Sequence, residues 1–321
     1  MNMAYRGAAL RAAIELDIFT VIAKGANTTG RIAKSVRASE RGVRIVCDLM
    51  VVMGFLRKTG GAYSLTSDSA EYMDKRSASY MGDLAKLSLQ ADAWPFLAKP
   101  ELAVRAGGSV MGRDADMEIE LPEWVEFARA FAPMMRLPAE AVAARLAGAK
   151  ECTVLELAAG HGLFGIAIAK RNPRAFVTAM DWPSVVGVAR RNAARAGVAK
   201  RFSTIAGNVF AADLEGPYDL ALISNFVHML SPKQNVRMFA KAHASLKPGG
   251  RMALFEFVVN EDRVSPETSA MFAMAMLTAT QGGDTYTFSE IERMCLEAGF
   301  VRCHLRPVAN LEQRLVIAIK R

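Results

Sequence analysis

The chain has 321 residues, of which 52% are hydrophobic and 22% are charged, and its formal net charge is +8. This length allows two domains of ordinary size, and the apolar fraction excludes long disordered stretches. Because the basic residues are scattered along the chain, they indicate a solvated surface rather than a nucleic-acid-binding face.

The first hundred residues predict a small helical domain. Apolar residues recur at helical spacing over residues 4–23, and capping residues begin two further helices, over 28–36 and 39–52. Residues 55–65 predict a β-hairpin that turns at Gly60 and Gly61. Three helices followed by a hairpin are the pattern of a winged helix, which can serve DNA binding or dimerisation.

The middle of the chain predicts two helices separated by a linker. One helix is expected over 79–97, and the glycine-rich stretch 99–116 is expected to be the linker. Pro122 opens the next helix, which carries an apolar stripe made of Trp124, Phe127, Phe131, Met134 and Met135. Such a stripe usually belongs to a core, but methionine and aromatic side chains together also suit an adaptable ligand pocket.

From Thr153 onward, strands alternate with helices, the pattern of a doubly wound α/β domain. Strands are expected at 153–158, 175–180, 202–206, 218–223, 250–258, 302–307 and 314–319, and a helix at 288–298. We therefore predict a helical domain over 1–100 and, over 101–321, a Rossmann-like domain with a seven-stranded mixed sheet.

The stretch Thr153–Gly165 runs from a strand through a glycine loop into a helix. Backbone at Gly160 and Gly162 can approach a ligand closely, and the helix N-terminus favours anionic groups. The letters also fit the dinucleotide pattern G-x-G-x-x-G, which alone is weak evidence, since such glycines often serve only the turn.

An acid and a polar turn follow the next two strands. Asp181 stands 21 residues after Gly160, where it can accept hydrogen bonds from both ribose hydroxyls of a nucleoside. Asn208 and Val209 follow the third strand and can meet an adenine ring. These features support a nucleoside without choosing between a nicotinamide cofactor and S-adenosylmethionine (SAM).

With these motifs in order, the chain resembles the class I SAM-dependent small-molecule O-methyltransferases, which include caffeate-, acetylserotonin- and antibiotic-methylating enzymes. The resemblance covers nearly the whole chain, from Arg11–Phe19 and Met53–Leu56 through the glycine loop to the turn Lys247–Gly250. It implies SAM as methyl donor, S-adenosylhomocysteine (SAH) as product, and a winged helix that forms a homodimer and does not bind nucleic acid.

The resemblance also implies a catalytic pair. His228 stands at the family's position for the general base, and Glu256 at that of the acid that orients it. Histidine suits proton abstraction because it changes charge near neutral pH; the competing interpretation is a satisfied pocket histidine. This chain departs from the family at several positions: Thr285 replaces a second orienting acid, Ser224 a lysine that often touches SAM, and Asn208 an aspartate; Met229–Leu230 and Ala158–Ala159 also differ from the family's usual residues.

The expected ligand contacts fall into two groups. For the cofactor they are Glu156, Gly160, Gly162, Asp181, Trp182, Asn208, Val209, Ser224 and Asn225, while Gly165 is expected to serve helix packing. The acceptor is expected to be small and apolar or aromatic, between the helix of 124–135 and the stretch 270–280. Its expected contacts are Phe127, Phe131, Met134, Met276 and Thr280.

We predict O-methylation of a hydroxyl, and three alternatives stay open: S-methylation of a small thiol, a SAM-binding protein without methyl transfer, and a DNA-binding regulator. A nicotinamide oxidoreductase is disfavoured by Glu156 and by the turn Lys247–Gly250.

The remaining expectations concern location and metals. No apolar run reaches transmembrane length, no cleavable signal is evident, and the four cysteines lack Cys-x-x-Cys spacing. We therefore expect a cytoplasmic protein with reduced thiols and no membrane partner. No histidine pairs with cysteine or carboxylate at metal-ligand spacing, so no metal is expected.

Overall fold

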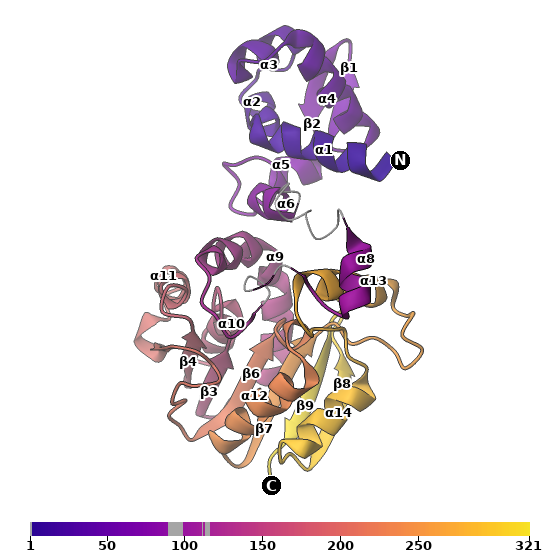
Figure 1. Ribbon diagram of the computed structural model, residues 1–321. Coiled ribbons are helices and arrows are strands. Elements are labelled where there is room, and N and C mark those ends of the chain that lie inside the picture. Colours follow the sequence, from indigo (N-terminus) through magenta and orange to yellow (C-terminus); the bar gives the residue numbers. More distant parts are fainter. Residues whose placement is uncertain (1, 89–98, 111, 113–115) are drawn as a thin grey trace. The chain divides into compact units, whose positions relative to one another are not determined.

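The computed structural model describes residues 2–88, 99–110, 112 and 116–321 (Figure 1). The chain divides into two compact units, Met1–Pro95 and Phe96–Arg321. The domain boundary expected at residues 100 and 101 stays a prediction. No helix within the described ranges is long and apolar enough to cross a membrane.

The N-terminal unit contains the predicted helices and hairpin. Its elements are α1 (Asn2–Glu15), α2 (Ile18–Ala23), α3 (Thr29–Val36), α4 (Glu40–Val52), β1 (Leu56–Thr59), β2 (Ala62–Leu65), α5 (Ser67–Tyr72) and α6 (Gly82–Ser88). The single helix expected over 4–23 is wrong, because Asp17 adopts a left-handed conformation (φ 56°) and divides it. Ser39 caps α4 as expected, accepting a hydrogen bond from the backbone N–H of Gly42.

The predicted linker proves partly helical. Helix α8 (Pro100–Ala106) begins with a proline in its first turn and is followed by Gly107, which is left-handed (φ 73°). Proline at the start and glycine just past the end are common helix boundaries, and the glycine-rich composition hid them. Of the helix expected over 79–97, α6 is the described part, and residues 89–98 lie outside the described residues.

The C-terminal unit is built on a seven-stranded mixed sheet, as predicted. Its strands are β3 (Cys152–Leu157), β4 (Ala175–Asp181), β5 (Phe202–Ala206), β6 (Tyr218–Ser224), β7 (Leu246–Glu256), β8 (Arg302–Pro307) and β9 (Arg314–Ile319). They lie in the order β5-β4-β3-β6-β7-β9-β8, with β3 to β7 parallel and β9 antiparallel to both of its neighbours.

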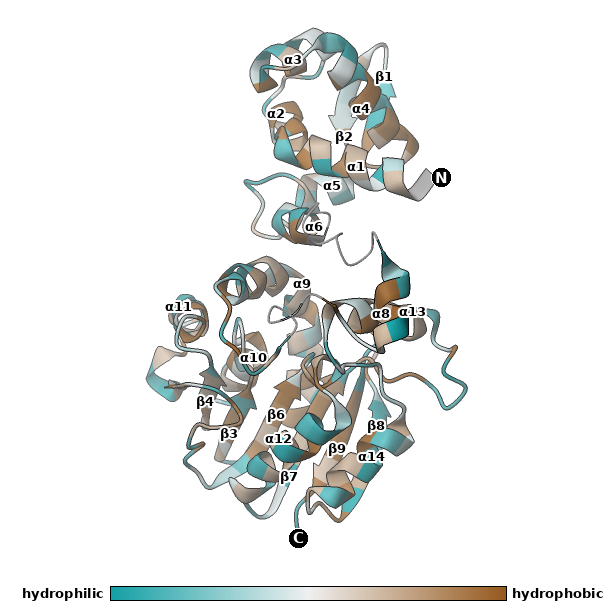
Figure 2. Cartoon of the chain, in the orientation of Figure 1, coloured by the Kyte–Doolittle hydropathy of each residue, from teal (hydrophilic) through white to brown (hydrophobic). Residues whose placement is uncertain are grey.

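Helices cover both faces of this sheet. They are α9 (Glu123–Leu146), α10 (Leu163–Arg171), α11 (Val186–Arg195), α12 (Pro232–Ala244) and α14 (Phe288–Glu297), while α13 (Glu267–Ala279) packs on α8. Helices α9, α10 and α11 contact one another on one side, and α12 packs on α14 on the other. Figure 2 shows that the strands are largely hydrophobic, whereas α12 and α14 carry hydrophilic residues. The sheet is therefore buried on both faces, as parallel sheets require.

The chain order places the site. From β3 the chain moves outward to β4 and β5, then returns to the other side of β3 to form β6 and β7. A crevice opens at the carboxyl ends of the strands where the order reverses, here between β3 and β6. The glycine loop, Asp181, Ser224 and Glu256 all stand at this edge.

Candidate active site

A cavity of about 410 Å³ lies at the carboxyl edge of the sheet and extends from the glycine loop to α9 and α13. Its wall is mostly apolar. Its ionisable, amide and hydroxyl side chains are His161, Asp181, Ser224, Asn225, His228 and Gln313. A large apolar cavity with a few converging polar groups is the usual form of a small-molecule site.

The two glycines of the loop have different roles. Gly160 lines the cavity in a left-handed conformation (φ 53°), and a Cβ there would meet only Ala128, at 3.9 Å. Gly162 begins α10 (φ 69°), and its Cβ would lie 2.8 Å from Cβ of Ala189 on α11. Gly160 is thus open to a ligand. Gly162 was expected to contact the ligand, but instead it allows α10 and α11 to pack closely.

Glu156 supports the loop from beneath and does not line the cavity. Its fully buried carboxyl group accepts a hydrogen bond of 3.0 Å from the backbone N–H of Gly165. Burial raises the pKa of Glu156 to about 8. A Cβ on Gly165 would lie 2.5 Å from this carboxylate, so Gly165 serves packing as expected. Glu156 was expected to contact the cofactor, but instead it supports the first turn of α10.

Asp181 faces the cavity from the end of β4. Oδ2 accepts a hydrogen bond of 2.6 Å from the backbone N–H of Gly160, and Oδ1 accepts one of 2.7 Å from that of Trp182. Burial raises the pKa of Asp181 to about 6, so the group is mainly ionised at pH 7. Each oxygen keeps a lone pair, which allows the carboxylate to accept from two ligand hydroxyls.

His161 also lines the cavity, although the sequence motifs did not predict it. Its Nδ1 accepts a hydrogen bond of 3.2 Å from the backbone N–H of Leu163, so the proton is assigned to Nε2. Burial lowers the pKa of His161 to about 4, which leaves the ring neutral at physiological pH. Its position between the two loop glycines was the available signal.

His228 and Glu256 form a buried pair. His228 lies in the short 3₁₀ helix Val227–Met229 and lines the cavity, and its Nδ1 is 2.6 Å from Oε1 of Glu256, the last residue of β7. Oε1 also accepts a hydrogen bond of 2.8 Å from the backbone N–H of Phe257. A carboxylate that accepts from Nδ1–H fixes the tautomer and leaves Nε2 free to take a proton.

The loop that carries His228 is held by neighbouring elements. The Asn235 amide donates to the carbonyls of Val227 and Leu230, at 2.9 and 3.1 Å, and the Tyr286 hydroxyl donates to Leu230 at 2.5 Å. The backbone of Gly283 packs so closely on the His228 carbonyl that a Cβ would clash. The imidazole is thus positioned by rigid parts of the fold.

Among the described residues, no second carboxylate contacts His228 or Glu256. Thr285 is buried at the family's position for that acid. Asp284, one residue earlier, accepts a hydrogen bond from the backbone N–H of Thr285 and pairs with Arg263 at a partly exposed site. Glu256 is therefore the carboxylate partner that the structure gives His228.

The far end of the cavity is aromatic. Phe127, Phe131 and Met134 line it from α9, with the two phenyl rings stacked at 4.1 Å, and Met276 lines it from α13. The α9 stripe therefore forms a pocket wall as well as core. Two further rings, Phe257 and Phe272, also line this end, and Phe272 meets the His228 ring edge-on at 4.9 Å. Phe272 lies in the stretch 270–280 that was expected to line the acceptor pocket, whereas Phe257 was not expected there.

Thr280 does not line this end, contrary to expectation. It is fully buried, and its hydroxyl donates to the Met276 carbonyl and accepts from the backbone N–H of Gly283, both at 2.8 Å. Thr280 was expected to contact the methyl acceptor, but instead it supports the turn after α13.

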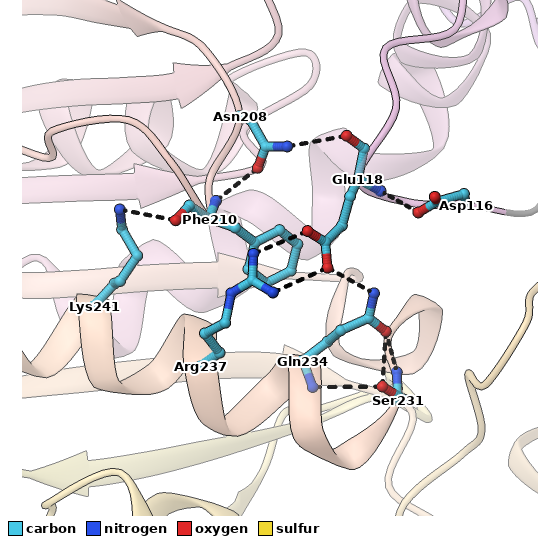
Figure 3. Close-up of polar contacts among 8 residues, drawn as sticks. All are labelled: Asp116, Glu118, Asn208, Phe210, Ser231, Gln234, Arg237 and Lys241. Atoms are coloured by element: carbon cyan, nitrogen blue, oxygen red, sulfur yellow. Dashed lines mark hydrogen bonds and ion pairs between the residues drawn. The ribbon is translucent and has the colours of Figure 1, made fainter.

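Most of the remaining expected cofactor residues line the cavity, namely Trp182, Val209, Ser224 and Asn225. Asn208 does not. Its amide donates to the carbonyl of Glu118 at 3.0 Å, and its Oδ1 accepts from the backbone N–H of Phe210 at 2.7 Å (Figure 3). Asn208 therefore holds a neighbouring segment instead of facing adenine.

Comparison with known proteins adds family information. The family profile of the O-methyltransferase domain matches residues 120–301, and that of the O-methyltransferase dimerisation domain matches residues 1–75. The 3-hydroxy-5-methyl-1-naphthoate 3-O-methyltransferase of Streptomyces sahachiroi is 27% identical over 293 residues, which cover 90% of this chain and 84% of the relative.

Two solved structures share the whole fold. A candidate O-methyltransferase from Nostoc punctiforme PCC 73102 superposes with a TM-score of 0.92 at 38% identity, covering 99% of this chain and 96% of the other. Human N-acetylserotonin methyltransferase, solved in complex with SAM, superposes with a TM-score of 0.86 at 20% identity, covering 99% and 95%. The second likeness concerns the fold alone.

Proposed function

The chain belongs to the O-methyltransferase family, and on that premise we propose that His228 removes the proton of an aromatic hydroxyl held at the α9–α13 end of the cavity. The observation that carries the proposal is the cavity-lining imidazole of His228, whose Nδ1 lies 2.6 Å from the buried carboxylate of Glu256.

The methyl donor is SAM, which supplies an electrophilic methyl group when bound and leaves as SAH. The residues at the glycine-loop end fit it. Gly160 presents open backbone to the cavity, and Asp181 offers an ionised acceptor for ribose hydroxyls. His161 adds a neutral N–H donor there. We propose Gly160, Asp181, Trp182, Val209, Ser224 and Asn225 as cofactor contacts, together with His161.

The acceptor is proposed to be a small aromatic molecule with a free hydroxyl. Phe131, Phe272 and Met276 give the cavity an apolar wall, Phe272 meets the His228 ring edge-on, and stacked or edge-on rings favour an aromatic ligand. The name of the Streptomyces sahachiroi relative, a hydroxynaphthoate methyltransferase, supports the same class.

The proton transfer follows from the His228–Glu256 geometry. The Nδ1–H of His228 is donated to Glu256, so Nε2 is free to take the proton of the substrate's hydroxyl. The carboxylate of Glu256 then stabilises the imidazolium that forms. The hydroxyl oxygen then carries the charge it needs to attack a methyl group. Phe257 and Phe272 exclude water from the ring, which strengthens the histidine–carboxylate attraction.

The proposal is tested with SAM and a panel of naphthols, phenols and thiols, by measuring SAH formation. We expect turnover of an aromatic hydroxyl and a loss of about 10²–10⁴-fold in kcat for His228→Ala, with SAH affinity unchanged. Near-normal turnover by His228→Ala, or turnover of thiols only, would contradict the role given to His228.

We also propose that the chain forms a homodimer, because residues 1–75 match the family's dimerisation domain. Light scattering coupled to size exclusion should give twice the chain mass of 34.8 kDa. A monomer at micromolar concentration would refute the assembly without affecting the assignment of His228.

A further inference from the structure

The segment Asp116–Leu121, which precedes α9, forms part of the cavity wall. Met117 lines the cavity and is only 7% exposed, and it belongs to the same hydrophobic cluster as Met180, near the end of β4, and Val209, in the turn after β5. The segment begins with a turn in which the Asp116 carboxylate accepts a hydrogen bond of 2.9 Å from the backbone N–H of Glu118.

Glu118 fastens this segment to α12. Its carboxylate accepts hydrogen bonds of 3.2 and 2.9 Å from the two terminal nitrogens of Arg237, and one of 3.2 Å from the amide of Gln234 (Figure 3). Its carbonyl accepts the bond from Asn208, in the turn after β5. We call this set of contacts, made by Glu118 with Arg237, Gln234 and Asn208, the Glu118 clamp.

The far end of the segment has an anchor on another element. Oε1 of Glu120 accepts a hydrogen bond of 2.9 Å from the backbone N–H of Ser184, in the loop after β4. The segment is therefore tied both to the β4–α11 loop and to α12, with Met117 against the cavity. Arg237 is itself fixed, because its guanidinium lies 4.3 Å from the centre of the Phe210 ring.

The wall next to Met117 has an unused donor. Trp124, in the first turn of α9, lines the cavity, and its indole N–H is buried without a hydrogen-bond partner within the described part of the chain. A buried N–H without a partner is costly, so it points to a ligand acceptor at this wall.

We propose that Glu118 is a positioning residue for the cofactor: the Glu118 clamp holds Met117 against the nucleoside part of SAM or SAH and slows its release. This inference rests on the proposed placement of the nucleoside at Asp181, whose wall Met117, Trp182 and Val209 share. It does not depend on the acceptor or on His228.

The strength of the clamp follows from its exposure. The side chains of Glu118 and Arg237 are 31% and 51% exposed, so solvent screens their attraction. A pair of this kind changes rates by about two- to fivefold when its charge is removed. Glu118→Ala also removes the hydrogen bond from Gln234, so its effect should exceed that of the isosteric Glu118→Gln.

The test measures SAH dissociation by stopped-flow tryptophan fluorescence, because Trp124 and Trp182 both line the cavity. We expect release to be about two- to fivefold faster in Glu118→Gln and faster still in Glu118→Ala. The KM for SAM should rise, while kcat, measured with a methyl acceptor that the enzyme methylates, stays the same. The matched control is Lys247→Gln, which breaks a similarly half-exposed ion pair with Asp219 near the amino ends of β3 and β6; its release rate should be native.

A double-mutant cycle separates the clamp from general loosening of the fold. Arg237→Gln should accelerate release as Glu118→Gln does, and the double variant should be no faster than either single variant. Native release rates in Glu118→Gln and Glu118→Ala would overturn the proposal, as would effects that simply multiply in the double variant. Since the readout is SAH binding alone, a failure here is distinct from a failure of His228→Ala to lose activity.

Discussion

Glu256→Gln tests the contribution of charge to the His228 pair. Glutamine keeps the size of the side chain, and its amide oxygen can still accept from His228 Nδ1–H and from the Phe257 backbone, now at 2.6 and 2.8 Å from Oε1. The negative charge that stabilises a protonated imidazole is lost. Both partners are buried, so solvent does not replace it.

The size of the effect follows from this burial. A hydrogen bond to a charged group contributes about 1.5–3 kcal/mol, which corresponds to about 10- to 150-fold in rate if it is lost only when His228 carries the proton. We therefore expect kcat to fall by about that factor while the KM for SAM is unchanged. Methyl transfer to a reactive naphthol, followed by SAH release, measures both.

Two controls make the test decisive. In a His228→Ala background, Glu256→Gln should cost little more, because the two residues act as a unit. The activity of His228→Ala should also rise as the pH approaches about 10, where a phenol ionises without a base. Native kcat in Glu256→Gln, or losses that multiply in the double variant, would refute this account.

Two further predictions concern the glycine-loop end. Because burial raises the pKa of Asp181 to about 6, its carboxylate is protonated as the pH falls below that value and loses its charge as an acceptor; calorimetry should show the Kd for SAH rising by up to about tenfold per pH unit below 6, and a flat profile for native protein would contradict the role. Gly165→Ala should lower the free energy of unfolding in urea by about 1–3 kcal/mol, since its Cβ would lie 2.5 Å from Glu156 and 2.6 Å from Val177. Gly187→Ala, also within a helix but with only the end of a flexible arginine at 3.4 Å, should be neutral or stabilising, and equal losses in both variants would refute the packing argument.

The parts of the site that the sequence could predict stand at strand ends. Parallel strands bring their carboxyl ends to one edge, so Asp181 at the end of β4 was expected there from the strand pattern, whereas Ser224 and Glu256 were placed by family resemblance. The structure brings them to that edge. The closeness of His228 to Glu256, 28 residues apart, came from family resemblance and not from residue spacing.

The parts that could not be predicted depend on long-range packing. Gly162 stands at a loop position typical of ligand-contacting glycines, but Ala189 on another helix occupies the space where its Cβ would lie. Asn208 is bound to a backbone carbonyl 90 residues earlier, at Glu118. Local sequence patterns do not identify such partners. The contact expected between Thr280 and the methyl acceptor is missing for a local reason. The Thr280 hydroxyl bonds to a carbonyl of the preceding helix instead of facing the cavity.

The charges around the cavity suit a cationic donor. Among the described residues that line it there is no lysine or arginine, Ser224 stands where the family often has a lysine, and His161 is kept neutral by burial. Asp181 is the ionised carboxylate of this wall near pH 7. A sulfonium ion removed from water therefore meets a carboxylate and aromatic faces, and no fixed positive charge opposes it.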